Sequence, residues 1–158
     1  MAAGAVCVKA LEAKGIKVAT HILECAGVRD AAFSQETHLL QEQMEKVDAS
    51  DFPVIADVED KMKDAILAAK SDGDSVGGLI QTCIYGIPAG VGEPWFDSLE
   101  SSISRAVFGI GGIKGIEFGS GFGFAGMRGS QANDPFRIKD GKVVTLTNHN
   151  GGINGGIY

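Results

Sequence analysis

Glycine is the residue type with the greatest chemical consequence in this chain, and it is concentrated in the segment 147–158. Four glycines lie in the six positions from 151 to 156. Residues without a Cβ adopt positive φ and let a ligand approach the backbone closely. Because ordering such a loop costs much conformational entropy, we expect other elements to hold it. The chain ends at Tyr158, directly after the loop, so we expect it to be a piece of a larger protein.

A second run of glycines covers 109–115, with the sequence Gly-Ile-Gly-Gly-Ile-Lys-Gly. It joins an expected amphipathic helix to an expected strand. Glycines here would let a planar ring or a phosphate lie against the main chain. A close crossover from helix to strand would require the same residues. Both interpretations stay open from the run alone.

A third run, Gly121–Gly126, matches the pattern G-x-G-x-x-G. A dinucleotide fingerprint needs a strand before the pattern and a helix that opens within it. Residues 127–135 show no helical apolar face, so the pattern favours glycines in close-packed antiparallel strands. A nicotinamide-binding domain would require a helix near Gly126.

The three histidines are not spaced as metal ligands. His21 lies beside Leu23 and Cys25 on one face of an expected strand, which predicts a structural histidine with its hydrogen bonds satisfied. His38 lies in a polar segment and is expected to be solvated. His149 lies in the glycine loop, where function is common. No second histidine or carboxylate is near it in sequence, so no catalytic triad is predicted.

Metal binding is not indicated elsewhere. Cys7, Cys25 and Cys83 form no CxxC pair, so we expect buried, reduced thiols in a cytoplasmic protein. The segment 72–78 lacks the ligands of an EF-hand and the lysine of a P-loop. It is predicted to be a helix C-cap that leads into a strand.

Composition limits the class of protein. The 158 residues fit one domain, and the net charge of −6 argues against a general nucleic-acid binder. No apolar run approaches the ~20 residues that span a bilayer. The first residues lack the basic region of a signal peptide.

Hydrophobic periodicity predicts alternating helices and strands. Helices are expected at 2–14, 35–46, 57–70 and from Pro94 to about 110, and strands at 17–28 and 75–87. The segment 139–142 reads as a hairpin turn, which favours antiparallel pairing over parallel βαβ units. The predicted class is α+β.

Five segments together resemble the middle of chorismate synthase, and their order and spacing agree from Ala2 to Tyr158. In chain order they are Gly73–Gly78, Gly86–Asp97, Lys114–Gly119, Arg128–Ser130 with Asn133 and Asp134, and Asn148–Ile157.

The resemblance implies a specific activity and fold. Chorismate synthase converts 5-enolpyruvylshikimate 3-phosphate to chorismate by 1,4-elimination of phosphate and requires reduced FMN. The family is a cytoplasmic lyase of the shikimate pathway, which leads to aromatic amino acids, and it is a homotetramer. Its helices are packed between antiparallel sheets, so residues 1–158 would form a single partial domain. No nucleic acid and no membrane would be partners.

The resemblance also implies where the cofactor lies. Gly111 and Gly112 match positions that contact FMN between helix and strand, and Gly155 matches another position in the closing loop. The family often has Asn at the position of Gly111, so any side-chain contact is absent here. Backbone fit without a ligand is the alternative for all three glycines.

Several family motifs are missing from the chain. These are the Gly-Glu-Ser-His-Gly motif, the second catalytic histidine, the Arg-rich stretch expected before Ala2, and the Lys-Pro-Thr and Arg-His-Asp regions expected after Tyr158. We therefore expect no catalytic residue and no metal site in the chain, and no activity in isolation. The alternative is a complete, non-catalytic module that binds flavin or a partner.

Overall fold

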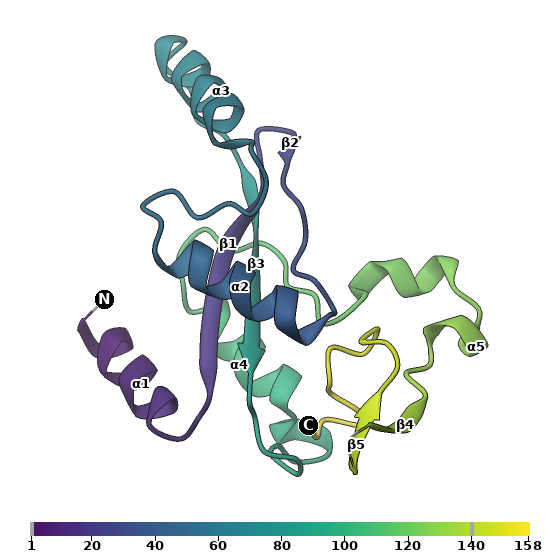
Figure 1. Cartoon of the computed structure of the whole chain (residues 1–158). Coiled ribbons are helices and arrows are strands. Elements are labelled where there is room, and N and C mark those ends of the chain that lie inside the picture. Colours follow the sequence, from purple (N-terminus) through teal and green to yellow (C-terminus); the bar gives the residue numbers. More distant parts are fainter. Residues whose placement is uncertain (1, 140) are drawn as a thin grey trace. The chain divides into compact units, whose positions relative to one another are not determined.

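The computed structural model describes residues 2–139 and 141–158 and is shown in Figure 1. The chain divides into two compact units, Met1–Gly86 and Ile87–Tyr158. All strand ladders among the described residues are antiparallel, and helices accompany them in both units. The predicted α+β class is therefore confirmed.

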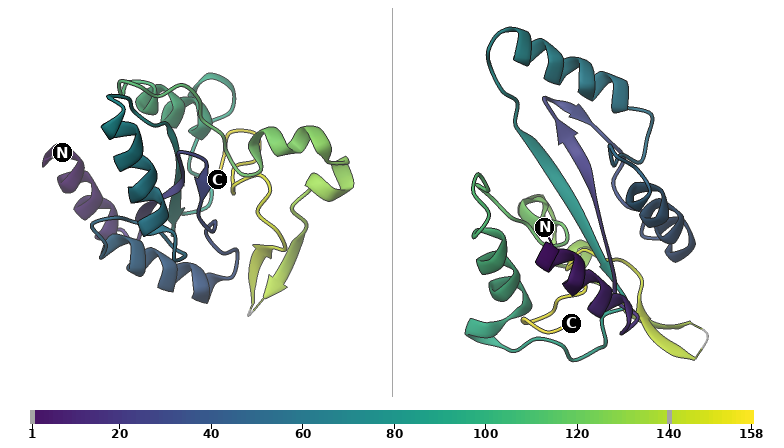
Figure 2. Two further views of the ribbon diagram at one scale, coloured as in Figure 1. Left: turned by 90° about the horizontal axis from the view of Figure 1, so that it is seen from above. Right: turned by 90° about the vertical axis from the view of Figure 1, so that its left-hand side faces the viewer.

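The first unit is built on a three-stranded sheet with the strand order β2-β1-β3. The long strands β1 (Lys17–Cys25) and β3 (Gly78–Tyr85) pair along their length, and Figure 2 shows them side by side. The strand predicted for 17–28 ends at Cys25, because Ala26 and Gly27 adopt φ of 50° and 79° and reverse the chain. A short strand, β2 (Val28–Arg29), follows the turn.

Three helices, α1 (Ala2–Glu12), α2 (Thr37–Asp48) and α3 (Glu59–Ser71), accompany this sheet. Alternation along β1 places His21 and Cys25 on its buried face, as predicted from the period of two, and Ala19 shares that face. Leu23, predicted on the same face, is half-buried and lies where the pairing register shifts between Ile22 and Glu24. Two apolar clusters form there. They consist of Ala19 with Met44 and Val47, and of Cys25 with Val54 and Met62.

The end of α3 confirms the predicted C-cap. The Asp74 N–H donates to the Ala69 carbonyl at 2.9 Å, and the Gly73 N–H donates to the Lys70 carbonyl at 3.1 Å. Gly73 has φ of 70°. This is the hydrogen-bond pattern of a Schellman motif. The segment 72–78 therefore ends a helix, and the described residues include no group of three or more side chains suited to a metal ion.

The second unit contains η1 (Trp95–Asp97), α4 (Leu99–Val107), η2 (Gly121–Gly126), α5 (Gly129–Ala132), β4 (Phe136–Lys139) and β5 (Lys142–Thr145). Pro94 precedes a 3₁₀ turn, and the α-helix begins only at Leu99. Ser98 defines that start, since its Oγ accepts the Ser101 N–H at 3.1 Å. Pairing of Lys139 with Lys142 confirms the hairpin, although Asp140 of the predicted turn lies outside the described residues.

The strands predicted around Gly121–Gly126 are wrong, because this segment is a 3₁₀-helix. Gly119 and Gly121 have φ of 57° and 49°, which a strand does not accommodate. Short-range bonds follow, such as the Gly123 N–H to the Ser120 carbonyl at 2.8 Å. A dinucleotide-binding unit needs a strand directly before the glycine pattern and parallel pairing of that strand. Residues 108–120 contain no strand, and no ladder among the described residues is parallel. A dinucleotide-binding unit is therefore excluded, although the short helix α5 follows the pattern.

The three cysteines differ in their exposure to solvent. Cys25 is buried and Cys83 half-buried, but Cys7 is exposed, because α1 has no buried residue. The prediction of three buried thiols is wrong at Cys7. Burial raises the pKa of the Cys83 thiol.

Among residues 2–139 and 141–158, no helix has the length and apolar character needed to span a bilayer.

Candidate functional site

The three glycines expected to contact a cofactor have open surroundings. No atom outside their chain neighbours lies within 4 Å of a Cβ built at Gly111, Gly112 or Gly155. Gly112 and Gly155 have φ of 93° and 63°, so their backbone alone favours glycine. Gly111 has neither a crowded Cβ position nor a positive φ. Its glycine is therefore explained by neither packing nor backbone conformation.

The segment 150–157 forms two successive tight turns, which we call the double turn. The Ile153 N–H donates to the Asn150 carbonyl at 3.2 Å, and the Ile157 N–H donates to the Asn154 carbonyl at 3.3 Å. Both central glycines of each turn have positive φ, between 63° and 92°. A bond from i+3 to i with positive φ at both central positions is the signature of type I′.

A repeat in the sequence encodes this arrangement. Asn-Gly-Gly-Ile occurs at 150–153 and again at 154–157. The two turns are linked, because the Asn150 side-chain amide donates to Asn154 Oδ1 at 2.9 Å. No paired turn was predicted here, although this tandem repeat is the signal that indicates one.

Packing within the double turn leaves one glycine open. A Cβ at Gly152 would lie 2.5 Å from the Tyr158 ring, and one at Gly156 would lie 2.6 Å from the Glu93 carbonyl oxygen. Gly151 is also crowded by backbone. Gly155 alone among the four has open space at that position, as a ligand-facing glycine would.

Asp134 holds the start of the double turn and is only 6% exposed. Its Oδ1 accepts the Thr147 hydroxyl at 2.6 Å and the His149 N–H at 2.7 Å, and its Oδ2 accepts the Asn150 N–H at 2.8 Å. Burial acts to raise the pKa of Asp134, but these hydrogen bonds outweigh it and hold the pKa below its ordinary value. The side chain is therefore an anion that organises a loop.

His149 is bound by a residue 29 positions earlier. The Ser120 N–H donates to the His149 carbonyl at 2.7 Å, and Ser120 Oγ lies 3.1 Å from Nδ1 of the ring. The sequence pointed to no partner for this histidine. Both the backbone and the ring of His149 are therefore hydrogen-bonded to Ser120, in the segment that precedes η2.

The expected cofactor glycines lie at the two ends of α4. The Leu99 N–H at its start donates to the Gly156 carbonyl at 3.0 Å, while Gly111 and Gly112 follow its far end. The helix has nine residues, so its ends are about 13 Å apart. A group much shorter than this helix would not contact both ends.

The remaining histidines behave as predicted. His21 is fully buried, with Nδ1 3.0 Å from Asp30 Oδ2 and Nε2 2.9 Å from Gln81 Oε1. This confirms a structural histidine. The side chain of His38 is 84% exposed, as expected for a solvated residue, and lies 3.6 Å from Glu42.

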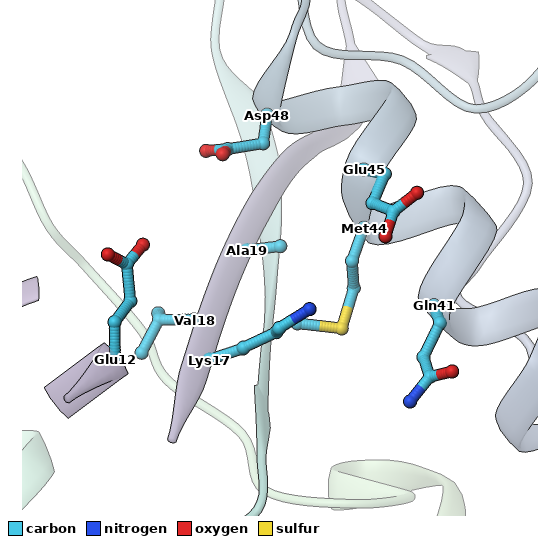
Figure 3. Close-up of a pocket in the computed structure, with 8 residues that line it drawn as sticks. All are labelled: Glu12, Lys17, Val18, Ala19, Gln41, Met44, Glu45 and Asp48. Carbon is cyan, nitrogen blue, oxygen red and sulfur yellow. The ribbon is translucent and has the colours of Figure 1, made fainter. Parts of the chain in front are cut away.

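A separate pocket of about 140 Å³ lies in the first unit, beside β1 and α2. Figure 3 shows its lining, which consists of Glu12, Lys17, Val18, Ala19, Gln41, Met44, Glu45 and Asp48. Three carboxylate side chains and one ammonium side chain belong to this lining. None of the glycines predicted to contact a cofactor belongs to this pocket.

The chain is similar to known proteins over its whole length. The family model described as chorismate synthase matches residues 1–158. A chorismate synthase of Methanosarcina barkeri is 43% identical over 160 residues, which cover 99% of this chain and 42% of the relative. One of Thermococcus kodakarensis is 43% identical over 149 residues, covering 94% of this chain and 40% of the relative.

A solved structure agrees with the sequence comparisons. The chain resembles one described as a crystal structure of chorismate synthase with a TM-score of 0.87 and 29% identity, over 98% of this chain and 49% of the other. The chain thus spans less than half the length of the curated relatives it matches.

Helices with antiparallel ladders and a glycine double turn define an α+β protein with a hydrogen-bonded, glycine-rich loop. With all of its residues matched by the family model, the chain belongs to the chorismate synthase family.

Proposed function

We propose that this chain is the part of a chorismate synthase that forms one wall of the flavin site. The complete protein would catalyse the 1,4-elimination of phosphate from 5-enolpyruvylshikimate 3-phosphate, as a homotetrameric lyase of the cytoplasm. Family membership supports the activity. Residues 1–158 would serve as a single partial domain, the middle segment of that fold.

One observation supports the flavin wall most directly. Gly111 lacks a side chain although neither packing nor φ requires glycine there. Close approach of a flat ligand to the backbone is a physical reason that remains. Gly112, beside it, and Gly155 at the other end of α4 also have open Cβ positions. In this proposal an elongated cofactor such as FMN bridges the two contact points at the ends of the helix.

The residues present fit reduced FMN at three glycines whose Cβ positions are open. When bound, the reduced flavin supplies an electron-rich ring beside the substrate. The chain contributes backbone surface at Gly111, Gly112 and Gly155 and a loop held rigid by Asp134. It contributes none of the acid–base histidines that the family resemblance implies, so proton transfer belongs to other parts of the complete protein.

The first prediction separates the chain from the complete protein. The 158-residue chain, supplied with reduced FMN and substrate, is expected to form no chorismate, whereas the protein from the complete open reading frame is expected to form it. Chorismate is measured by anaerobic absorbance and chromatography. Product from the isolated chain would contradict the proposed division of roles. Flavin binding without product by the complete protein would favour the alternative, a non-catalytic flavin-binding module.

The second prediction concerns Gly111. In the complete protein, Gly111→Val is expected to weaken FMN binding at least about tenfold, since a branched side chain would stand where the cofactor approaches. Its backbone conformation tolerates a side chain, so folding should be preserved. Flavin titration measures the effect.

Gly115→Val is the matched control, because the family resemblance assigns a flavin contact to Gly111 and none to Gly115. Gly115 lies in the same segment, also has no positive φ, and also has no atom within 4 Å of its Cβ position. Equal FMN affinity in both variants and wild type would remove Gly111 from the site. Gly112→Val is less informative, because φ of 93° would strain any side chain there.

A further inference from the structure

We infer that Asp134 is a positioning residue for the cofactor, which sets the double turn so that the open side of Gly155 faces the ligand. The inference rests on the proposed function, because it assigns Asp134 a role in that same site. It is carried by a continuous set of hydrogen bonds from the carboxylate to the second turn.

The first step is the use of both carboxylate oxygens. Oδ1 accepts from Thr147 and from the His149 N–H, and Oδ2 accepts from the Asn150 N–H, at 2.6 to 2.8 Å. All three partners are donors, so an ionised carboxylate satisfies every one of them. An asparagine at 134 would place an amide NH₂ against one donor and leave that contact repulsive.

The second step carries the constraint to Gly155. Asn150 begins the first turn, and its side-chain amide donates to Asn154 Oδ1 at 2.9 Å. Asn154 in turn begins the second turn, whose first central residue is Gly155. The orientation of the Gly155 backbone thus depends on Asp134 through Asn150 and Asn154. No atom lies within 4 Å of a Cβ built at Gly155.

The far end of the double turn is held by different bonds. The Leu99 N–H donates to the Gly156 carbonyl at 3.0 Å, and the Tyr158 N–H donates to the Val91 carbonyl at 2.9 Å. Loss of Asp134 should therefore release the first turn and tilt the second, while the loop stays attached. A change in ligand affinity is expected before a loss of the fold.

The chain offers a closely matched control in Asp30. Asp30 is 7% exposed and likewise accepts two consecutive backbone N–H groups, those of Ile55 and Ala56, at 2.6 and 2.7 Å. It lies in the first unit, and its side chain bonds His21, Ile55 and Ala56 of that same unit. Asp30→Asn makes the same chemical change without the proposed link to Gly155.

The experiment compares wild type, Asp134→Asn and Asp30→Asn in the complete protein. FMN affinity is measured by flavin titration, and kcat and KM for substrate are measured at saturating reduced FMN. Asp134→Asn is expected to weaken FMN about tenfold with a smaller change of kcat at saturation. Asp30→Asn is expected to lower the melting temperature and leave FMN affinity unchanged.

A second pair of variants keeps the test decisive where Asp134→Asn folds poorly. Asn154→Ala removes the acceptor of the link between the turns and should weaken FMN, whereas Asn154→Asp keeps an acceptor and should restore affinity. Asn154 is exposed, so neither change disturbs a core. Hydrogen exchange at 150–157, compared with 17–25, should rise in Asp134→Asn and in Asn154→Ala.

The outcomes separate the two proposals. A wild type that binds no flavin overturns the proposed function and this inference with it. A wild type that binds flavin, with Asp134→Asn or Asn154→Ala binding equally well, overturns the positioning role alone. Equal weakening of FMN by Asp30→Asn and Asp134→Asn also overturns it, since a general loss of stability then explains both.

Discussion

Gly119→Ala is expected to disrupt the fold of the second unit, with a loss of stability of about 4 kcal/mol or more. A Cβ at this position would overlap the His149 carbonyl oxygen and lie 2.6 Å from the Gly151 nitrogen and 2.7 Å from the Asn150 carbonyl carbon. All of these are backbone atoms, so no side chain can move aside. The φ of 57° adds strain for any residue with a Cβ.

Gly115→Ala serves as the control for this prediction. It adds the same methyl group four residues earlier, where no atom lies within 4 Å. Hydrogen exchange over 87–158 in the complete protein should rise sharply in Gly119→Ala and stay unchanged in Gly115→Ala. Comparable protection in the two variants would show that the segments 117–121 and 148–151 are not packed as described.

Gly119 illustrates what the sequence could not predict. In the sequence, Gly119 cannot be told apart from the other glycines of residues 87–158. Only the structure distinguishes glycines that packing requires from glycines with open surroundings. That distinction depends on contacts between positions about 30 residues apart, such as Ser120 with His149. Local patterns carry no information on such register.

Periodicity succeeded where one face of an element is buried. The alternation along 17–25 placed His21 and Cys25 correctly on one face, because burial of one sheet face imposes a period of two. It failed at Gly121–Gly126, since glycine leaves φ undetermined and apolar residues between glycines show no helical or strand period. The 3₁₀ bonds of that segment decide its form instead.

The family resemblance identified the candidate glycines, and the geometry ranks them. Of these three candidates, Gly111 is the one that backbone conformation and packing do not explain, whereas φ alone accounts for glycine at 112 and 155. Asp134, Ser120 and the asparagines of the double turn were not predicted as site residues. Their roles arise from hydrogen bonds to backbone groups, which the type of a residue does not reveal.

Asp30→Ala is expected to cost the first unit about 3 to 5 kcal/mol, because it removes one partner of a buried, hydrogen-bonded pair. The Phe33 N–H donates to Gln81 Oε1 at 2.9 Å, which identifies that atom as the oxygen facing His21 Nε2. Nε2 therefore donates to Gln81, and Nδ1 faces the carboxylate of Asp30. Without Asp30, the fully buried His21 ring loses the hydrogen-bond partner of Nδ1.

The same substitution also removes the acceptor of two backbone groups. The N–H groups of Ile55 and Ala56 would lose their partner, and each buried donor without an acceptor costs about 1–3 kcal/mol. Asp51→Ala removes an exposed carboxylate and is the control. Hydrogen exchange of residues 17–33 and 52–58 should rise in Asp30→Ala alone.

Acid provides an independent check on this network. Burial acts to raise the pKa of Asp30, but the backbone hydrogen bonds from Ile55, Ala56 and Ala31 and the bond with His21 together hold it below the ordinary 3.8. A carboxylate with a lowered pKa stabilises the fold above its unfolded pKa, and this contribution disappears as pH falls through the folded value. The difference in the free energy of unfolding between wild type and Asp30→Ala should therefore have its largest value at neutral pH and become smaller below about pH 4. A difference independent of pH would mean that the charge of Asp30 contributes nothing, and that the substitution acts through packing alone.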